Sequence, residues 1–477
     1  MSHSIAKNTA FMTGASIAQK IISFVYFTLI ARSIGVEGTG KYFLALSFTT
    51  IFVVFVDLGL SNVLVREAAK VRNNIQKYLS TILSVKLLFA ALAYITVLVV
   101  AHLLYPADAE LRAMIYLSGV TMLFDSFNLT VYGVLRAIGD LRFESVSITV
   151  SQFLSLILGG VFLWLQLPLI FLILAYTVPS AINACFATFV VYKKYGVKVV
   201  PRFEKKTFVF LWKITVPFAL AAIFARVYGY IDSILLKQML GTEAVGWYST
   251  PYKITYAFQF VPLALTAAIY PRMSEYFITK KEKLAVILHD SIKYLLLVSM
   301  PIAVGICVLA RPIILMLYGD AFLPSVLPLQ VLIVSLVFSF VGFPIGACLN
   351  ACNRQTTQTT IVGFVMILNI SMNLLLIPRI GVVGAAIAAL VGNTVLTLLG
   401  YAFLPTIAPI SHKQYALTFF RLLFCGIVMG VVVYVAHRAS NMFLAIAVGA
   451  VVYIVMIFIT GILTKAEVLE AGKMIKK

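Results

Sequence analysis

Long apolar runs, separated by short polar or basic segments, make up most of the chain. Apolar and polar residues do not alternate strictly, as they would along the strands of a membrane β-barrel. Apolar runs of about twenty residues can cross a bilayer as helices. The pattern predicts an all-α polytopic membrane protein with fourteen helices, at about 12–33, 42–65, 79–104, 113–135, 144–166, 168–192, 209–236, 247–271, 286–310, 325–349, 357–378, 381–405, 416–436 and 441–463.

The segment that follows the first expected helix occurs again 206 positions later. The sequence IGVEGTGKY at 34–42 returns as LGTEAVGWY at 240–248. A second echo, LRAIGD at 135–140 and LNACNR at 349–354, ends the fourth and the tenth expected helices. We interpret the chain as a duplication; the identities in the first register include Gly35/Gly241, Glu37/Glu243, Gly40/Gly246, Tyr42/Tyr248 and Arg66/Arg272.

Each copy holds six expected helices. Because six is an even number, both copies enter the membrane from the same face, and we expect parallel repeats related by an axis along the membrane normal. The expected domains are an N-terminal six-helix bundle at 1–196, a basic cytoplasmic linker at 197–206, a C-terminal six-helix bundle at 207–408, and two further helices with a cytoplasmic tail at 409–477.

The repeated glycines are expected to form a structural hinge in each copy: Gly35 and Gly40 in the first, Gly241 and Gly246 in the second. Gly35 and Gly40 suit a tight reversal that needs positive φ. A phosphate-binding loop is the alternative, but no strand precedes these glycines and no Lys-Ser/Thr pair follows them.

Composition agrees with a membrane protein, since 62% of the residues are hydrophobic, 11% are charged and the mean hydropathy is +1.03. The formal net charge of +20 would suit nucleic acid, but the cations gather in the loops on one side. That side holds about three times as many Lys and Arg as the other, which predicts that it is cytoplasmic and holds both termini. We therefore expect the linker to face anionic lipids and expect no nucleic-acid partner. The first residues show no signal-peptide pattern. The Cys and His residues of the whole sequence form no metal-ligand pattern.

Several ionisable residues fall near the centres of expected helices, where each would cost about 2.5–3.5 kcal/mol against lipid. They are Lys20, Asp57, Lys86, Asp125, Arg226 and Asp232. We expect them to face an aqueous, net cationic cavity between the two copies, which would attract an anionic cargo. A structural ion pair is the alternative for each charge, and Tyr230 is a candidate for stacking on a sugar. No nucleophile–base pair, paired-carboxylate site, ATP-binding loop or metal cluster occurs, so we expect a transporter and not an enzyme.

At these residues the sequence resembles a family. The segment ARSIGVEGTG at 31–40, the sequence DLGL at 57–60 followed by Arg66, and the sequence YID at 230–232 before the second hinge are similar to those of bacterial polysaccharide-biosynthesis flippases. These are the Wzx-type O-antigen and teichuronic-acid exporters of the multidrug/oligosaccharidyl-lipid/polysaccharide superfamily. The resemblance implies two six-helix bundles around a V-shaped cavity that opens alternately to each face of the bacterial cytoplasmic membrane.

The resemblance further implies that the cargo is an undecaprenyl-diphosphate-linked oligosaccharide, moved from the inner to the outer leaflet. It implies substrate binding by Lys20, Arg66, Arg226 and Arg272. Tyr230 is the further candidate that the residues themselves suggest, and Asp57, Asp125 and Asp232 are expected as coupling or cavity acids. No cofactor is expected; the coupling ion, Na⁺ or H⁺, stays open, and polysaccharide polymerase and ligase machinery is a further candidate partner. A multidrug/cation antiporter of the same superfamily is the alternative function. A membrane-embedded glycan polymerase or ligase is disfavoured because no large extracytoplasmic loop is present.

Overall fold

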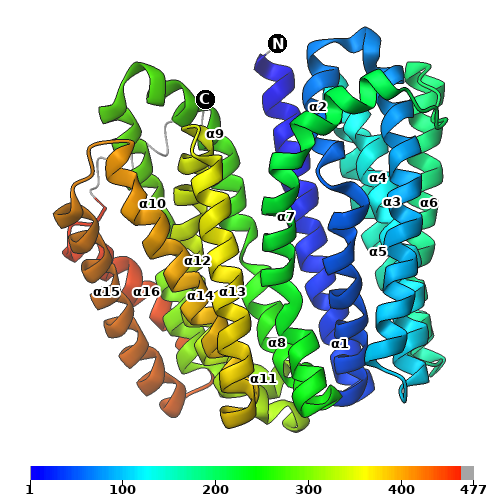
Figure 1. The fold of residues 1–477 in the computed structure, drawn as a ribbon. Helices are drawn as coiled ribbons and strands as arrows, with labels where there is room; N and C mark the ends of the chain where they lie inside the picture. The colour runs from blue at the N-terminus through cyan, green and yellow to red at the C-terminus, as the bar shows by residue number, and fades with distance from the viewer. Residues whose placement is uncertain (1, 464–477) are drawn as a thin grey trace. The chain divides into compact units, whose positions relative to one another are not determined.

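The computed structural model describes the backbone of residues 2–463, and the side chains of this range apart from those of residues 2–13, 213 and 216–218. The described chain is helical and contains no strand (Figure 1), which confirms the predicted all-α class. The helices are α1 Ser2–Asp57, α2 Leu60–Lys70, α3 Ile75–Leu104, α4 Ala109–Ile138, α5 Arg142–Trp164, α6 Ile170–Tyr195, α7 Lys205–Leu240, α8 Thr242–Ala257, α9 Phe260–Thr279, α10 Lys281–Val308, α11 Ala310–Tyr318, α12 Val326–Ala351, α13 Gln355–Ile380, α14 Val382–Phe403, α15 His412–Ala439 and α16 Met442–Ile459, with 3₁₀ turns at Arg72–Asn74, Asp320–Ser325 and Leu404–Thr406.

Thirteen helical segments within the described residues are long and apolar enough to cross a membrane. The first of them, Gly14–Asp57, has 44 residues. A straight helix of that length would measure about 66 Å, twice the thickness of a bilayer core. It is interrupted at Gly35, whose φ of 70° and ψ of −171° are not helical. The first segment therefore provides two crossings, and the fourteen predicted spans are all accounted for.

A second interruption falls inside the helix that the sequence predicts at 42–65. Leu58 and Gly59 have φ angles of 45° and 87°, and α2 begins after them. The carboxylate of Asp57 accepts hydrogen bonds from the backbone N–H groups of Gly59 at 3.1 Å and Ser61 at 3.3 Å. These are N–H groups that the start of a helix otherwise leaves unpaired, so Asp57 stabilises the new helix start.

Contacts between Cα atoms divide the chain into two compact units. The first contains Met1–Ser249 and Ile370–Val382, and the second contains Thr250–Asn369 and Val383–Lys477. The first unit thus includes α7, the start of α8 and the end of α13. The sequence-based domain boundaries stay a prediction, and the tail beyond residue 463 lies outside the described residues.

In the first unit, α4 packs on α6, and α1 packs on α4, α5 and α7 (Figure 1). Leu64, Leu79, Val131 and Val191 are fully buried in one cluster that joins α2, α3, α4 and α6. Leucine and valine side chains from facing helices fill this core, as the close packing of protein interiors requires.

The second unit has its own core, in which Leu295 of α10 contacts Ile333, Leu336 and Phe340 of α12. The two helices that have no counterpart in the repeat, α15 and α16, pack on each other and on α10. The Tyr453 hydroxyl of α16 donates a hydrogen bond to the Leu297 carbonyl of α10 at 3.0 Å.

Large apolar side chains are exposed along the outer helix faces. Leu87 and Leu88 of α3 are each 60% exposed, and Ile459 of α16 is 71% exposed. Exposed apolar surface on helices of this length is what a lipid environment requires. The protein is therefore a multi-pass membrane protein.

The second sequence echo corresponds to one structural motif. Gly139 and Asn353 both adopt positive φ, at 89° and 60°. One residue after each of them, the Asp140 N–H donates to the Leu135 carbonyl at 3.0 Å, and the Arg354 N–H donates to the Leu349 carbonyl at 2.8 Å. This six-to-one bond around a left-handed residue is a helix C-cap of the Schellman type. The caps lie 214 positions apart, as the echo predicts.

Candidate functional site

The first glycine of each hinge breaks a helix. Gly35 has a φ of 70°, and Gly241, its counterpart, has a φ of 95°. A residue with a Cβ atom is strained in this region of backbone space, whereas glycine is not. The positive φ expected at Gly35 is thus found, and Gly241 also has a positive φ. The function of these glycines as hinges stays a prediction.

The second glycine of each hinge has another task. Gly40 and Gly246 lie inside helices, so the positive φ expected at Gly40 is not found. A Cβ atom added at Gly40 would lie 2.1 Å from the Thr242 carbonyl oxygen, and one added at Gly246 would lie 2.2 Å from the Val36 carbonyl oxygen. Glycine is needed here because the backbones of α1 and α8 approach each other closely.

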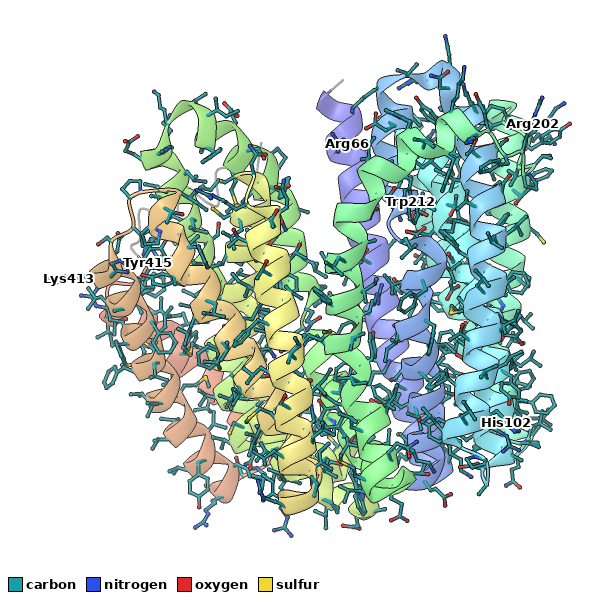
Figure 2. All side chains as sticks on the ribbon, in the orientation of Figure 1. Arg66, His102, Arg202, Trp212, Lys413 and Tyr415 are labelled. Atoms are coloured by element: carbon teal, nitrogen blue, oxygen red, sulfur yellow. The ribbon has the colours of Figure 1, made fainter. Side chains whose placement is uncertain are left out.

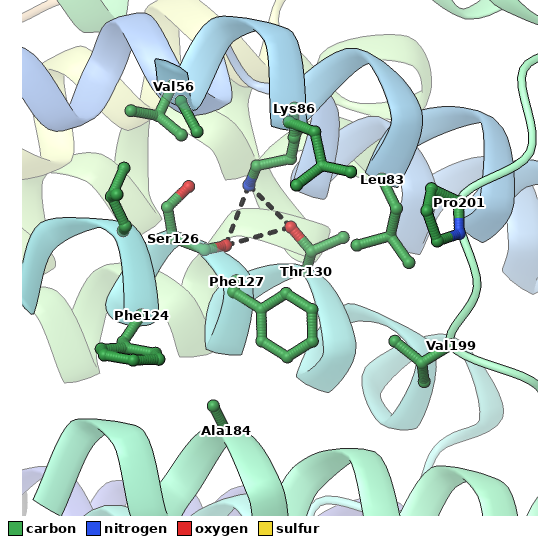
Figure 3. A pocket seen from close by; sticks show the side chains of 13 residues that line it. Val56, Leu83, Lys86, Phe124, Ser126, Phe127, Thr130, Ala184, Val199 and Pro201 are labelled. Carbon is green, nitrogen blue, oxygen red and sulfur yellow. Dashed lines mark hydrogen bonds between the residues drawn. The ribbon is translucent and has the colours of Figure 1, made fainter. Parts of the chain in front are cut away.

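Asp57 and Lys86 form an ion pair inside the first unit. Lys86 is 5% exposed, and its Nζ lies 2.6 Å from Asp57 Oδ1. The same ammonium group donates to Thr130 Oγ1 at 2.6 Å and to the Ser126 carbonyl at 2.9 Å (Figure 3). An ammonium group has three N–H donors, so these acceptors satisfy it. Lys86 therefore joins α1, α3 and α4.

A cavity of about 370 Å³ lies beside Lys86 (Figure 3). Its other walls are almost entirely apolar, with contributions from Leu83, Phe124, Phe127 and Pro201. Because the one ammonium group at its wall is already satisfied, the cavity offers little to orient a polar ligand. We assign Lys86 to the packing of the helices.

Asp125 lies in a separate, polar cavity of about 290 Å³ between α4, α5 and α6. Its side chain is exposed to this space. The Ser180 hydroxyl donates a hydrogen bond to Asp125 Oδ1. Thr121, Asn128, Gln152 and other polar side chains contribute to the lining.

Asp232 is buried in α7 and is 4% exposed. Its Oδ2 accepts a hydrogen bond from the Tyr248 hydroxyl at 2.7 Å, and its Oδ1 accepts one from Asn373 Nδ2 at 2.8 Å. Tyr248 is the repeated tyrosine of the hinge. The three residues connect α7, α8 and α13 within the first unit.

The same place in the first copy holds a tyrosine and a glycine instead of a carboxylate and an amide. In the hinge register Tyr26 corresponds to Asp232, and in the register of the helix caps Gly159 corresponds to Asn373. A Cβ atom added at Gly159 would lie 2.0 Å from the Tyr26 hydroxyl, so the ring of Tyr26 packs on the bare backbone of α5. The two copies therefore keep one contact but differ in its chemistry.

The expected substrate-binding residues do not line either of the two cavities described above. Lys20 in α1 and Tyr230 in α7 are half-buried, whereas Arg226 in α7 is exposed. Arg66 in α2 is 57% exposed, with its Nε 3.4 Å from Glu67 Oε1. Arg272 is exposed on α9, in the second unit.

Figure 2 shows Arg66 and Arg202 at one end of the first unit and His102 at the opposite end. Arg202 belongs to the basic linker, and its backbone N–H donates a hydrogen bond to the Ser80 carbonyl at 3.0 Å. Arg66 thus lies at the end of its helix bundle where the linker is anchored.

Sequence reasoning missed two features of these sites. The Lys86–Asp57 pair could have been proposed from two opposite charges near the centres of successive expected helices. The association of Asp125 with Ser180 and Asn128 had only a weak signal, because serine and asparagine are common in membrane helices.

Comparison with known proteins shows which family the chain belongs to. The family profile described as polysaccharide biosynthesis protein matches residues 5–277, and the profile of the lipid II flippase MurJ matches residues 254–453. A probable low-salt glycan biosynthesis flippase, Agl15, of Haloferax volcanii is 24% identical over 447 residues, which cover 91% of each chain. A putative O-antigen transporter of Shigella flexneri is 22% identical over 404 residues, which cover 81% of this chain and 94% of that protein.

Solved structures agree in fold. The lipid II flippase MurJ in an inward closed conformation superposes with a TM-score of 0.77 at 16% identity, covering 93% of this chain and 97% of that one. An inward-facing multidrug resistance transporter of the MATE family and the MOP superfamily gives a TM-score of 0.66 at 14% identity, covering 81% of this chain and 94% of that one. The polysaccharide biosynthesis protein profile matches more than half of this chain, so the chain belongs to that family. Its fold is the transporter fold shared by lipid II flippases and MATE transporters.

Proposed function

We propose that the protein is a flippase that moves a lipid-linked oligosaccharide from the inner to the outer leaflet by alternating access. Undecaprenyl diphosphate is the proposed lipid anchor, and the bacterial cytoplasmic membrane, with both termini on the cytoplasmic side, is the proposed location. The names of the similar proteins, a glycan biosynthesis flippase and an O-antigen transporter, support this class of cargo.

The observation that carries the proposal is an exposed arginine within a membrane span. Arg226 lies in the segment Ala219–Leu240, and its side chain is exposed. An arginine that faced acyl chains there would cost about 2.5–3.5 kcal/mol. Water and an anionic cargo remove that cost, which supports a cargo with a phosphate group, because a guanidinium group can bind phosphate through two parallel hydrogen bonds.

Tyr230 lies one helical turn after Arg226, so both side chains lie on one face of α7. An aromatic ring beside a phosphate-binding arginine suits a sugar linked to that phosphate. Asp232 lies six residues after Arg226, on another face, and is already bonded to Tyr248. This geometry supports a site in which the Arg226 guanidinium group does not pair with Asp232 and can bind the cargo. Lys20, Arg66 and Arg272 are the further proposed contacts.

The test is the amount of lipid-linked glycan that is accessible on the outer leaflet of cells carrying Arg226→Ala or Arg272→Ala. We expect less accessible glycan and accumulation of precursor on the inner leaflet. Arg226→Lys should restore part of the transport, since it keeps the charge but loses the two-point geometry. Arg311→Ala, which removes an exposed arginine on α11, is the matched control. Normal translocation by both alanine variants at wild-type protein levels would remove the site assignment.

A multidrug or cation antiporter is the second candidate. The exposed carboxylate of Asp125 in a polar cavity favours it, because cationic compounds need an acidic partner. Drug-susceptibility testing of cells that overexpress the protein separates the two functions. Broad resistance would support the antiporter, and unchanged susceptibility with altered glycan exposure would support the flippase. Coupling to Na⁺ or H⁺ is proposed in either case.

A further inference from the structure

A groove separates α3 from α6 in the first unit. Both helices pack on α4, but within the described chain they make little direct contact with each other. The face of α4 between them is therefore not covered by either helix. The cavity beside Lys86 lies in this groove (Figure 3). Leu83 of α3, Phe127 of α4 and Ala184 of α6 all line it.

The basic linker closes one end of the groove. Val199 and Pro201 of the linker line the cavity at that end (Figure 3). The linker backbone is bonded to α3, because the Gln76 amide exchanges two hydrogen bonds of 2.7 Å with the carbonyl and N–H groups of Lys198. The N–H group of Arg202 also donates to a carbonyl of α3. The linker is thus a fixed part of the cavity wall.

The cavity also reaches the outer, apolar surface of the bundle. Leu87 lines it and is 60% exposed. Leu83 and Ala90, which line it as well, lie about 12 Å and 22 Å along the helix axis from the start of α3 at Ile75. Half of a bilayer core measures about 15 Å. The cavity therefore lies at the depth of the acyl chains in the leaflet on the linker side.

An acyl chain suits this space. The volume of about 370 Å³ falls within the range of about 300–1,000 Å³ that is typical of small-molecule sites. The lining is almost entirely apolar, and the Lys86 ammonium group is already satisfied by Asp57, Ser126 and Thr130. An empty space of this size loses dispersion contacts on all its walls. A lipid chain from the surrounding leaflet restores those contacts without any demand for polar partners.

The linker end of the cavity carries positive charge. Lys198 and Arg202 are neighbours of the lining residues Val199 and Pro201, and both basic side chains are exposed. Neither forms an ion pair with any residue that the structure describes. Glu204, the one acidic residue of the linker, pairs with α3 through Lys77 at 2.9 Å. Two cations are thus left to bind a phosphate group, which forms strong hydrogen bonds with such groups.

We propose that the groove between α3 and α6 binds one anionic glycerophospholipid. An acyl chain occupies the cavity, and the phosphate group lies against Lys198 and Arg202. This is a single lipid at a defined site, which goes beyond a general attraction between the linker and anionic headgroups. The lipid is a structural partner and not the cargo, so the proposal does not depend on the proposed function. The bound lipid completes the packing between α3, α6 and the linker.

The test is native mass spectrometry of the purified, delipidated full-length protein, with dioleoyl phosphatidylglycerol or dioleoyl phosphatidylcholine added. We expect one phosphatidylglycerol molecule to bind about tenfold or more tightly than phosphatidylcholine, because basic residues attract anionic lipids. Ala90→Phe places a ring in the cavity and should lower the affinity for phosphatidylglycerol by about tenfold or more. Ala91→Phe is the matched control, since Ala91 is exposed on α3 and does not line the cavity.

The role of the two cations needs its own comparison. Lys198→Gln combined with Arg202→Gln should lower the affinity for phosphatidylglycerol to that for phosphatidylcholine, and should leave the affinity for phosphatidylcholine unchanged. Lys205→Gln combined with Lys206→Gln removes the same charge from exposed positions of the linker and should keep the preference. Equal losses in the two double variants would overturn the proposal, because the attraction would then be general.

The identity of the occupant is tested with a third probe, undecaprenyl phosphate. If it binds in preference to phosphatidylglycerol and Ala90→Phe abolishes that binding, the cavity is a site for the tail of the cargo and the proposal is wrong. Ala184→Leu, which reduces the cavity from the α6 wall, is the second filling variant if Ala90→Phe does not fold. Unchanged phosphatidylglycerol binding in the folded filling variants, or equal binding of the two phospholipids by the wild type, would also overturn the proposal.

Discussion

Gly246 lies so close to Val36 that a Cβ atom on the glycine would come within 2.2 Å of the valine carbonyl oxygen. The neighbouring atom is backbone and cannot rotate away. We expect Gly246→Ala to lower the free energy of unfolding by about 1–3 kcal/mol, the usual range for overpacking. Gly40→Ala should do the same, since its contact with the Thr242 carbonyl is equally close.

The control for both variants is Gly229→Ala in α7, where an added Cβ atom meets nothing within 4 Å. Alanine favours a helix over glycine by about 0.5–1 kcal/mol, so this variant should be neutral or stabilised. Thermal unfolding in detergent, followed by circular dichroism, measures all three. Equal melting temperatures for Gly246→Ala and Gly229→Ala would contradict the close contact.

Adjacent glycines in α5 allow a second comparison. At Gly159 a Cβ atom would lie 2.0 Å from the hydroxyl of Tyr26, which is 1% exposed and has no room to move. At Gly160 it would meet nothing within 4 Å. Gly159→Ala should therefore destabilise the protein by about 1–3 kcal/mol, whereas Gly160→Ala should not. If the two variants melt at the same temperature, the packing of Tyr26 on α5 is wrong.

Replacing Lys86 by methionine should be costly. The variant leaves the carboxylate of Asp57, which is 13% exposed, without its cation. Breaking a largely buried ion pair in this way costs about 3–5 kcal/mol. The double variant Asp57→Asn with Lys86→Met should be more stable than Lys86→Met alone, because no uncompensated charge remains. Lys77→Met is the matched control on α3. Lys77 is 47% exposed and pairs with Glu204, so its loss should cost about 1 kcal/mol or less. A double variant as unstable as the single one would argue against the pair.

Acid should release one clamp at the end of the first unit. Asp140, in the turn after α4, accepts hydrogen bonds from Arg142 at 3.1 Å, Tyr195 at 2.6 Å and Lys194 at 2.9 Å. The Arg142 guanidinium first of all, with Tyr195 and Lys194, holds the pKa of the Asp140 carboxyl well below its usual range. A lowered folded-state pKa means that the stabilisation is present above the usual aspartate pKa of about 4 and is lost as the pH falls below it.

Asp140→Asn should thus melt earlier than the wild type at neutral pH, by an amount equivalent to about 1 kcal/mol. The difference between the two proteins should shrink as the pH falls below about 4. Melting curves of both proteins across this range measure the effect. A difference that is constant with pH would mean that the Asp140 charge does not matter.

The sequence predicts the membrane-spanning helices well because the length of an apolar run is a local property. It predicts the interruption at Gly35 for the same reason, since the glycine and its repeat are visible. The interruption at Leu58–Gly59 was not expected, because the apolar run continues through it and the Asp57 cap forms only when the chain turns.

The candidate sites were harder to predict because they depend on which helices meet. A glycine in the sequence does not show whether it is needed for a positive φ or for a close backbone contact. Gly35, which has a positive φ, and Gly40, which lies at a close backbone contact, therefore look alike in the sequence. Likewise, a central charge shows that a partner or water is needed without naming it. Lys86 is the partner of Asp57, and Tyr248 is a partner of Asp232. Neither partner can be identified until the positions of α3 and α8 are known.

The contact between the two hinges has a consequence for the origin of the chain. Residues 36 and 242 correspond, as do 40 and 246, so Gly40 on Thr242 and Gly246 on Val36 are one contact made twice with the partners exchanged. A surface that pairs with its own copy in this way is the isologous interface of a twofold dimer. A single six-helix ancestor would therefore have formed this interface between two identical polypeptides before fusion joined them, and fusion then left Asp232 and Tyr26 free to diverge.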